Sequence, residues 1–210
     1  MKRRLLISSW LLVIPALLIT KPIFAAISGS WHDFSDYSFS GGESCVPCHA
    51  PHNVSSTIAP LWNHTVTTAS FTLYSSPTMN ATLGQPSASS KACLSCHDGT
   101  VAIDSFGGKT GTSFIGGRDK IGPNLSDDHP VSFTYDTVLA TADGTLFDPS
   151  TKTVPGLGGK TIAQGMLIGG KIECSSCHDV HKSKGYSPSS AKLLIINNSG
   201  SALCLTCHNK

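Results

Sequence analysis

The sequence has few aromatic side chains and little that could form a large apolar core. Aromatic residues make up only 7% of the 210 residues, whereas glycine alone occupies 20 positions, and serine and threonine are common. A chain of this composition buries too little apolar surface by itself to offset the conformational entropy lost on folding. We therefore expect the polypeptide to fold around bound groups and to be largely unfolded without them.

Only one long apolar run is present, and it lies near the N-terminus. A basic start at residues 2–4 precedes an apolar stretch over residues 5–19, which Pro15 interrupts, and small residues follow at Ala25. The stretch is short against the ~20 apolar residues that span a bilayer. The pattern is typical of a secretory signal peptide over residues 1–25. We expect an exported protein, in the periplasm or at the cell surface, rather than one held by a membrane anchor.

A cluster of basic residues is also missing from the rest of the chain. Without residues 1–25, 11 lysines and arginines stand against 13 aspartates and glutamates, a net charge of −2. The sequence pI of about 8.1 therefore reflects the N-terminal segment. Proteins that follow a phosphate backbone carry basic patches, so we expect no nucleic acid partner.

No cysteine lies outside a single repeated pattern. All eight cysteines belong to Cys-x-x-Cys-His motifs, which are Cys45-Val-Pro-Cys48-His49, Cys93-Leu-Ser-Cys96-His97, Cys174-Ser-Ser-Cys177-His178 and Cys204-Leu-Thr-Cys207-His208. This motif is the attachment signature of c-type haem. The two thiols add to the porphyrin vinyl groups, and the adjacent histidine ligates the iron from one side. The sequence therefore predicts four covalently attached haem c groups.

Other uses of paired cysteines fit the pattern less well. Zinc sites also use Cys-x-x-Cys pairs, but zinc gives no reason for a histidine at the next position all four times. A disulfide framework does not require this fixed spacing. A thioredoxin-like site needs one such pair on a strand–helix unit. Zinc is the main alternative to haem.

The remaining histidines are numerous enough to close every iron from its second side. Besides the motif histidines His49, His97, His178 and His208, the sequence contains His32, His52, His64, His129 and His181. Methionine could serve instead, but only Met79 and Met166 remain beyond the N-terminal segment. Bis-histidine ligation at all four haems is the economical interpretation, and it lowers the reduction potential relative to ligation by histidine and methionine.

Spacing predicts which haems some of these histidines reach. His49 and His52 are three residues apart, as are His178 and His181, so each pair faces one way on a helical turn and cannot close one iron from opposite sides. We expect His52 to serve the haem at His97, and His181 to serve the haem at His208. The alternative is that His52 and His181 are solvated loop histidines.

Three candidates remain for the other two haems. We expect His32 and His129 to be ligands and His64 to be the spare. His32 lies close to the mature N-terminus and is expected to be free to swing, whereas the carboxylates of Asp127 and Asp128 could orient His129.

The four motifs form two similar halves. Residues 26–100 hold an extended motif with the added histidine and then a plain one, and residues 172–210 repeat this order. The Gly-rich segment 101–171 between them favours loops and tight turns. We predict one tetrahaem domain over residues 26–210, mostly irregular loops with short α-helices around the haem motifs and little β-structure. Candidate short strands are residues 71–74 and 193–196.

Several segments beyond the motifs themselves resemble a known family. These are Gly41-Gly42-Glu43-Ser44-Cys45, Cys48-His49-Ala50-Pro51-His52, Pro60-Leu61-Trp62-Asn63, Cys93-Leu94-Ser95-Cys96-His97-Asp98-Gly99-Thr100-Val101, Asp128-His129-Pro130-Val131-Ser132 and Cys204-Leu205-Thr206-Cys207-His208-Asn209-Lys210. Together they resemble exported multihaem cytochromes with doubled Cys-x-x-Cys-His motifs, related in haem arrangement to the cytochrome c3 group and common in metal-reducing bacteria. The resemblance implies low-potential electron transfer through stacked bis-histidine haems. Some similar proteins form extracellular filaments in which a neighbouring subunit donates one axial histidine, a role open to His32.

These observations predict an electron carrier rather than an enzyme. Its partners would be redox proteins, either donor and acceptor cytochromes or a quinol-linked reductase, with self-association into filaments as a further possibility. A multihaem reductase needs at least one iron with an open position. Some such enzymes replace the motif histidine with lysine, and no Cys-x-x-Cys-Lys occurs here. A reductase is therefore the less favoured alternative.

Overall fold

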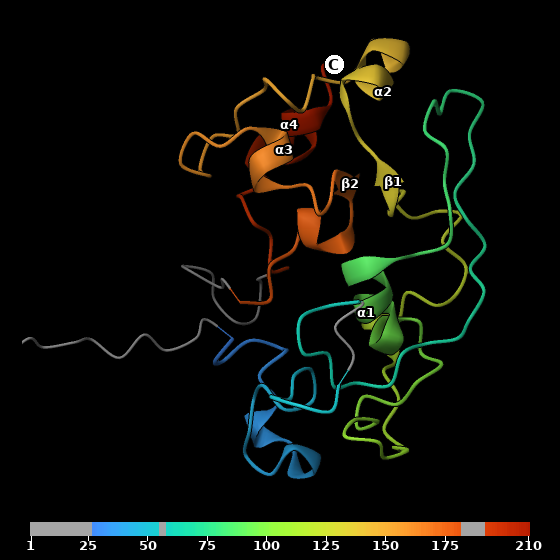
Figure 1. Cartoon of the computed structure of the whole chain (residues 1–210), viewed down its shortest axis with the longest axis vertical. Coiled ribbons are helices and arrows are strands. Elements are labelled where there is room, and N and C mark those ends of the chain that lie inside the picture. The colour runs from blue at the N-terminus through green and yellow to red at the C-terminus, as the bar shows by residue number, and fades with distance from the viewer. Residues whose placement is uncertain (1–26, 55–57, 182–191) are drawn as a thin grey trace, which may run out of the picture.

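The chain is mostly irregular in the computed structural model, which describes residues 27–54, 58–181 and 192–210 (Figure 1). The α-helices are α1 (Ala88–His97), α2 (Thr137–Asp143), α3 (Ile162–Gly165) and α4 (Cys204–Cys207). Short 3-10 turns are η1 (Phe34–Asp36), η2 (Ser38–Ser40), η3 (Gly117–Asp119), η4 (Cys174–Ser176) and η5 (Ser199–Ser201). The two strands β1 (Phe133–Thr134) and β2 (Lys171–Ile172) pair antiparallel. The predicted class, loops with short helices and little sheet, is confirmed.

Each Cys-x-x-Cys-His motif closes a single helical turn. The backbone N–H of the motif histidine donates to the carbonyl of the first cysteine at 2.8 Å in His49, 3.0 Å in His178 and 3.0 Å in His208. The motif of His97 ends helix α1. One turn places the two thiols and the imidazole on the same side of the chain. The prediction of helical pieces around the motifs is therefore confirmed.

The Gly-rich segment 101–171 contains more structure than the predicted loops. Asp136 caps α2 by accepting from the backbone N–H of Leu139 at 2.8 Å, and Gly144 ends the helix with φ 71°. A capping box between Thr161 and Gln164 starts α3. Both helices carry ordinary start signals, but each is too short for apolar periodicity to reveal it.

These helices contribute to the larger of two apolar clusters. Its buried members are Tyr135, Ala140, Val154, Ile162, Met166 and Ile172, and the last motif packs against it through Leu203 and Cys207. A smaller cluster joins Phe71, Leu94 and Leu125 around α1. The segment between the halves is thus packed against the last motif.

The two strands predicted from residue type do not form. In segment 71–74, Thr72 makes only an isolated bridge to Asn124, and in segment 193–196, Leu194 makes only an isolated bridge to His178. A β-ladder needs several successive paired residues, and these segments each find a partner at one position. The paired strands lie elsewhere, and β1 falls within Val131-Ser132-Phe133-Thr134-Tyr135-Asp136, where apolar and polar residues alternate.

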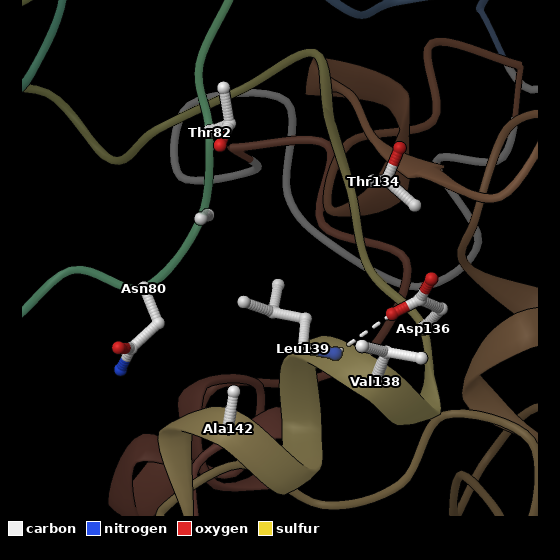
Figure 2. A pocket seen from close by; sticks show the side chains of 8 residues that line it. Asn80, Thr82, Thr134, Asp136, Val138, Leu139 and Ala142 are labelled. Carbon is white, nitrogen blue, oxygen red and sulfur yellow. Dashed lines mark hydrogen bonds between the residues drawn. The ribbon is translucent and has the colours of Figure 1, made fainter.

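The long chain segment between the first two motifs extends to helix α2, as the cyan to green trace at the right of Figure 1 shows. There Asn80 donates to the carboxylate of Asp143 at 3.2 Å. An open pocket lies between residues 80–82 and α2, and Figure 2 shows Asn80, Thr82, Thr134, Asp136, Val138, Leu139 and Ala142 around it. No cysteine or histidine lines this pocket, so it takes no part in the sites below.

The predicted signal peptide, residues 1–25, lies outside the described residues. Within residues 27–54, 58–181 and 192–210, no helix has the length and apolar character needed to cross a bilayer.

Candidate haem sites

The four motifs define four candidate sites, which we number in chain order. Site 1 comprises Cys45, Cys48 and His49; site 2, Cys93, Cys96 and His97; site 3, Cys174, Cys177 and His178; and site 4, Cys204, Cys207 and His208. All eight cysteines are free thiols, six partly buried and two exposed. Exposed or half-buried thiols are accessible to a porphyrin.

Thiols of consecutive sites lie close enough to influence one another. Burial, and then the nearby Cys48 of site 1, raise the pKa of Cys96 in site 2 to about 12. Burial, and then Cys177 of site 3, raise the pKa of Cys207 in site 4 to about 12. Sites 1 and 2 are therefore neighbours, and so are sites 3 and 4, as the doubling of the motifs suggests.

Sites 2 and 3 also meet, although they belong to different halves. A hydrogen bond to Cys174 raises the pKa of Cys93, which remains the donor of this thiol pair. Close by, the hydroxyls of Ser89 and Ser175 lie 2.6 Å apart. Helix α1 and turn η4 are thus in direct contact, and the four sites form a continuous series in chain order.

A buried glutamate fastens this junction. Glu173, just before the first cysteine of site 3, is 1% exposed. Its carboxylate accepts from Ser132 at 2.8 Å, from Ser87 at 3.3 Å and from Ser90. Ser90 Oγ in turn accepts from the backbone N–H of Cys174 at 2.9 Å. Sequence reasoning did not single out Glu173, whose only signal is a carboxylate directly before a motif.

Backbone carbonyls orient three of the four motif histidines. Each Nδ1 donates to a carbonyl oxygen, from His49 to Pro60 at 2.8 Å, from His97 to Asp119 at 2.6 Å and from His178 to Lys192 at 2.6 Å. A carbonyl only accepts, so Nδ1 carries the proton and Nε2 keeps its lone pair for a metal. Sequence reasoning missed these carbonyls, because backbone acceptors carry no residue signature.

Sites 1 and 3 share a further local feature. The motif histidine forms an antiparallel bridge with Trp62 in site 1 and with Leu194 in site 3. The residue before each bridge partner is left-handed, Leu61 with φ 53° and Leu193 with φ 51°. Its carbonyl accepts the N–H of the residue after the motif histidine, at 3.0 and 2.7 Å respectively. The two extended motifs therefore have the same surroundings, in agreement with the internal repeat.

Three motif histidines each have a second histidine ring beside them. The ring centroids are 6.0 Å apart for His97 and His32, 6.0 Å for His49 and His181, and 6.4 Å for His208 and His129. In each pair one ring belongs to a motif and the other does not.

These separations fit two imidazoles on one iron. A ring nitrogen binds a metal at about 2 Å and lies about 1.1 Å from its ring centre, so two axial imidazoles have centroids about 6.2 Å apart. Across the described residues, no group of three or more histidine, cysteine, aspartate or glutamate side chains is placed to hold one ion. The paired rings beside thiol pairs are the donor set of haem c, and the residues fit the group.

The observed pairing differs from the one expected from spacing. His181 lies beside His49 rather than His208, and site 2 has His32 beside it rather than His52. Spacing showed that His178 and His181 face different irons, but it could not show which. That choice depends on how the chain folds back between the two halves.

His32 is anchored rather than free to swing. The Asp33 carboxylate accepts from Ser44 at 2.5 Å, from the Ser35 hydroxyl at 2.7 Å and from the backbone N–H of Gly29 at 2.8 Å. Hydrogen bonds from Ser44 and Ser35 hold the pKa of Asp33 well below its usual range. These bonds tie the N-terminal segment to the residue before site 1 and so fix His32 beside site 2.

The His32 ring is in the state that a metal requires. Burial, and then the nearby His97 and His178, lower the pKa of His32 to about 4. The imidazole is therefore neutral near pH 7, with a lone pair available. Among the described residues, its Nδ1 and the indole Nε1 of Trp62 are the buried side-chain nitrogens without a hydrogen-bond partner. The Trp62 ring stands edge-on to His49, 6.3 Å away between centroids.

The distal candidates at sites 1 and 4 are each oriented by a near neighbour. His129 Nδ1 donates to the carbonyl of Pro130 at 2.9 Å, and the role of Asp127 and Asp128 in orienting the ring stays a prediction. His181 Nδ1 lies 3.7 Å from the carboxylate of Asp179. In both rings Nδ1 is engaged, which leaves Nε2 available to a metal.

The last two histidines differ sharply. His64 is 4% exposed, and its two ring nitrogens face carbonyls, Nδ1 that of Thr65 at 2.8 Å and Nε2 that of Ala102 at 3.0 Å. Its Nε2 also lies 3.4 Å from the Cys96 thiol of site 2, and the expectation that His64 is the spare stays a prediction. His52 is exposed, and the structure does not bring its ring against another.

Comparison with known families supports the chemistry of the C-terminal part. Residues 167–210, which contain sites 3 and 4, match the family model described as "Doubled CXXCH motif". No curated protein matches the chain. The match supports a c-type cytochrome-like multihaem motif, and the motifs indicate covalently bound haem c.

Proposed function

We propose that the chain is an exported tetrahaem c-type cytochrome, which carries electrons through four bis-histidine haems. The observation that carries this proposal is the set of three ring pairs, each made of one motif histidine and one other, at separations that suit a shared iron. The continuous series of thiol pairs supports a relay from site 1 to site 4.

The residues of the chain have distinct tasks in this proposal. When bound, haem c supplies an iron that alternates between its ferric and ferrous states without making or breaking a bond. The cysteine pairs of the four sites fix each macrocycle by thioether bonds. His49 with His181, His97 with His32, and His208 with His129 would hold two imidazoles toward sites 1, 2 and 4, respectively. Closed positions favour electron transfer over substrate binding.

Electron transfer is a better proposal than catalysis. A reductase requires a position on one iron that substrate can reach. At sites 1, 2 and 4 a second imidazole lies where substrate would approach, which supports a carrier. Its partners would be donor and acceptor cytochromes or a quinol-linked reductase, in the periplasm or at the cell surface.

Self-association into filaments remains a second possibility without direct support. In the structure His32 lies beside His97 of the same chain, 6.0 Å away between ring centroids. A histidine occupied within its own chain has no need to be donated to a neighbour. We therefore propose that each chain holds its own ligands.

The haem count tests the proposal. The purified exported protein should contain four haems per chain by absorbance of the pyridine complex and by intact mass, and reductive titration should take up four electrons. Cys174→Ala with Cys177→Ala should reduce both counts to three, whereas Ser175→Ala within the same motif should leave four. Zinc in place of haem, or fewer than four haems in the unaltered chain, would contradict the proposal.

A further inference from the structure

In the part of the chain that the structure describes, the motif histidines of sites 1, 2 and 4 each have a second histidine ring beside them. His178 of site 3 does not. Among the described residues, no ring contact joins His178 to a histidine outside the motifs, and His52 likewise has no ring contact. Yet His52 stands three residues after His49, just as His181 stands three residues after His178. Three observations connect the missing second ligand of site 3 with His52, the histidine that has no ring contact.

The first is the place of His181. Its ring lies 6.0 Å from His49 between centroids, with the ring planes 31° apart, so a residue of the second half faces a motif of the first half. Asp179 lies 3.7 Å from its Nδ1, which leaves the other ring nitrogen available to a metal. The four-residue segment 178–181 therefore lies across site 1 from His49.

The second is the direction of the two segments. His178 and His181 come from one short segment but serve different sites, since axial ligands approach an iron from opposite sides. Because His181 lies beside His49, segments 49–52 and 178–181 lie next to each other. An iron at site 3 would need a second ligand from the side opposite His178, and His52 belongs to the neighbouring segment.

The third is the local likeness of the two segments. His49 bridges Trp62 and His178 bridges Leu194, each bridge partner follows a left-handed leucine, and both histidines donate Nδ1 to the carbonyl two residues before the bridge partner. The backbone is therefore held in the same way at both motif histidines, and in both segments the second histidine follows three residues later. His64, the other histidine left over, is buried with both nitrogens against carbonyls.

We propose that the two extended motifs exchange their second histidines, so that His181 closes the iron of site 1 and His52 closes the iron of site 3. This inference rests on the proposed function, in which all four motifs carry haem. With this exchange, each half of the chain supplies a histidine that completes an iron site in the other half. The exchange also brings sites 1 and 3 together directly, so that the four haems form a compact group with more than one route for an electron.

Paired substitutions in the holoprotein test the exchange. His181→Ala in the four-haem protein should convert one haem in four from low-spin to high-spin in ferric electron paramagnetic resonance and absorption spectra. In a chain that lacks the site 1 haem through Cys45→Ala and Cys48→Ala, His181→Ala should produce no new high-spin haem. His52→Ala should likewise convert one haem to high-spin in the four-haem protein. It should produce no new high-spin haem in a chain that lacks the site 3 haem through Cys174→Ala and Cys177→Ala.

Crossed combinations and His64 supply the controls. His52→Ala should still give one high-spin haem in the chain without the site 1 haem, and His181→Ala should do so in the chain without the site 3 haem. His64→Ala should leave all four haems low-spin. A high-spin haem that persists when His181→Ala is added to the chain without the site 1 haem would show that His181 serves another iron and would overturn the exchange.

A second pair of variants answers the question without removing a haem. His181→Met and His52→Met, made separately, should each raise the potential of one haem, because methionine ligation raises it. In proton spectra of the reduced protein, the ligand methyl should contact thioether protons of site 1 for the first variant and of site 3 for the second. Contacts to site 2 or 4 would overturn the exchange and leave the proposed function intact. High-spin iron in the unaltered protein would instead count against the proposed function.

Discussion

Individual side chains decide which histidines can bind iron. Three of the four motif imidazoles, those of His49, His97 and His178, donate to backbone carbonyls, which fix the tautomer without adding charge. His32 is held less directly, through the hydrogen bonds of the neighbouring Asp33. His64 is buried with both nitrogens close to backbone carbonyls, and its Nε2 also lies 3.4 Å from the Cys96 thiol of site 2.

His32→Ala tests the ligand assigned to site 2. The variant should leave one iron with a single axial imidazole, and so produce one high-spin ferric haem and carbon monoxide binding after reduction. The neighbouring Trp31 is 73% exposed, and Trp31→Ala should leave all haems low-spin. An unchanged electron paramagnetic resonance spectrum of His32→Ala would show that His32 is no ligand.

His64→Asn tests the role of the spare histidine. Removing a buried ring that faces two carbonyls should cost about 1–3 kcal/mol in the free energy of unfolding. All four haems should stay low-spin, because no iron loses a ligand. Denaturant unfolding and absorption spectra of the holoprotein measure the two effects separately, and a high-spin haem would assign His64 as a ligand.

At the scale of elements, the junction of α1 and η4 holds the two halves together. Glu173 accepts three serine hydroxyls from α1 and the segments beside it, and the thiols of Cys93 and Cys174 meet next to it. This contact joins sites 2 and 3, which the doubled motifs alone do not connect.

Glu173→Gln should weaken that junction. The amide offers hydrogens where the serine hydroxyls need an acceptor, so we expect a loss of about 2 kcal/mol in the free energy of unfolding. Glu43 is exposed, and Glu43→Gln should change the stability by less than about 0.5 kcal/mol. Equal stability of the two variants in denaturant unfolding would show that the junction contributes little.

Two substitutions of the left-handed Leu61 test the backbone conformation beside site 1. Leu61 is 48% exposed and has φ 53°, a conformation that a β-branched residue adopts with strain and glycine without it. Leu61→Val should therefore be less stable than Leu61→Gly by about 1 kcal/mol. The reverse order in thermal unfolding would mean that this bridge does not hold the motif histidine.

The sequence was most informative where covalent chemistry fixes the residues. The motifs, their helical turns and the irregular fold class follow from local spacing. The partners of His49 and His97 do not, because they depend on contacts between segments far apart in the chain. Helix α3 carried a readable capping box from Thr161 to Gln164, whereas a bridge made by one residue, such as that of Leu194, leaves no pattern.

The whole molecule depends on the groups it binds. Its buried apolar side chains fall into two small clusters, and in the described residues most of the chain has no regular structure. A chain in which all eight cysteines are replaced by serine should therefore lose native-like circular dichroism and cooperative unfolding. Retention of both would show that the polypeptide folds without haem.

The central claim is that four irons are each closed by two histidines. Carbon monoxide binds ferrous haem only where an axial position is open or weakly held, so a difference spectrum of the dithionite-reduced holoprotein tests the claim directly. The account predicts no spectral change on adding carbon monoxide. A carbon monoxide adduct at any haem of the unaltered protein would contradict it and would point to an accessible iron, as a reductase requires.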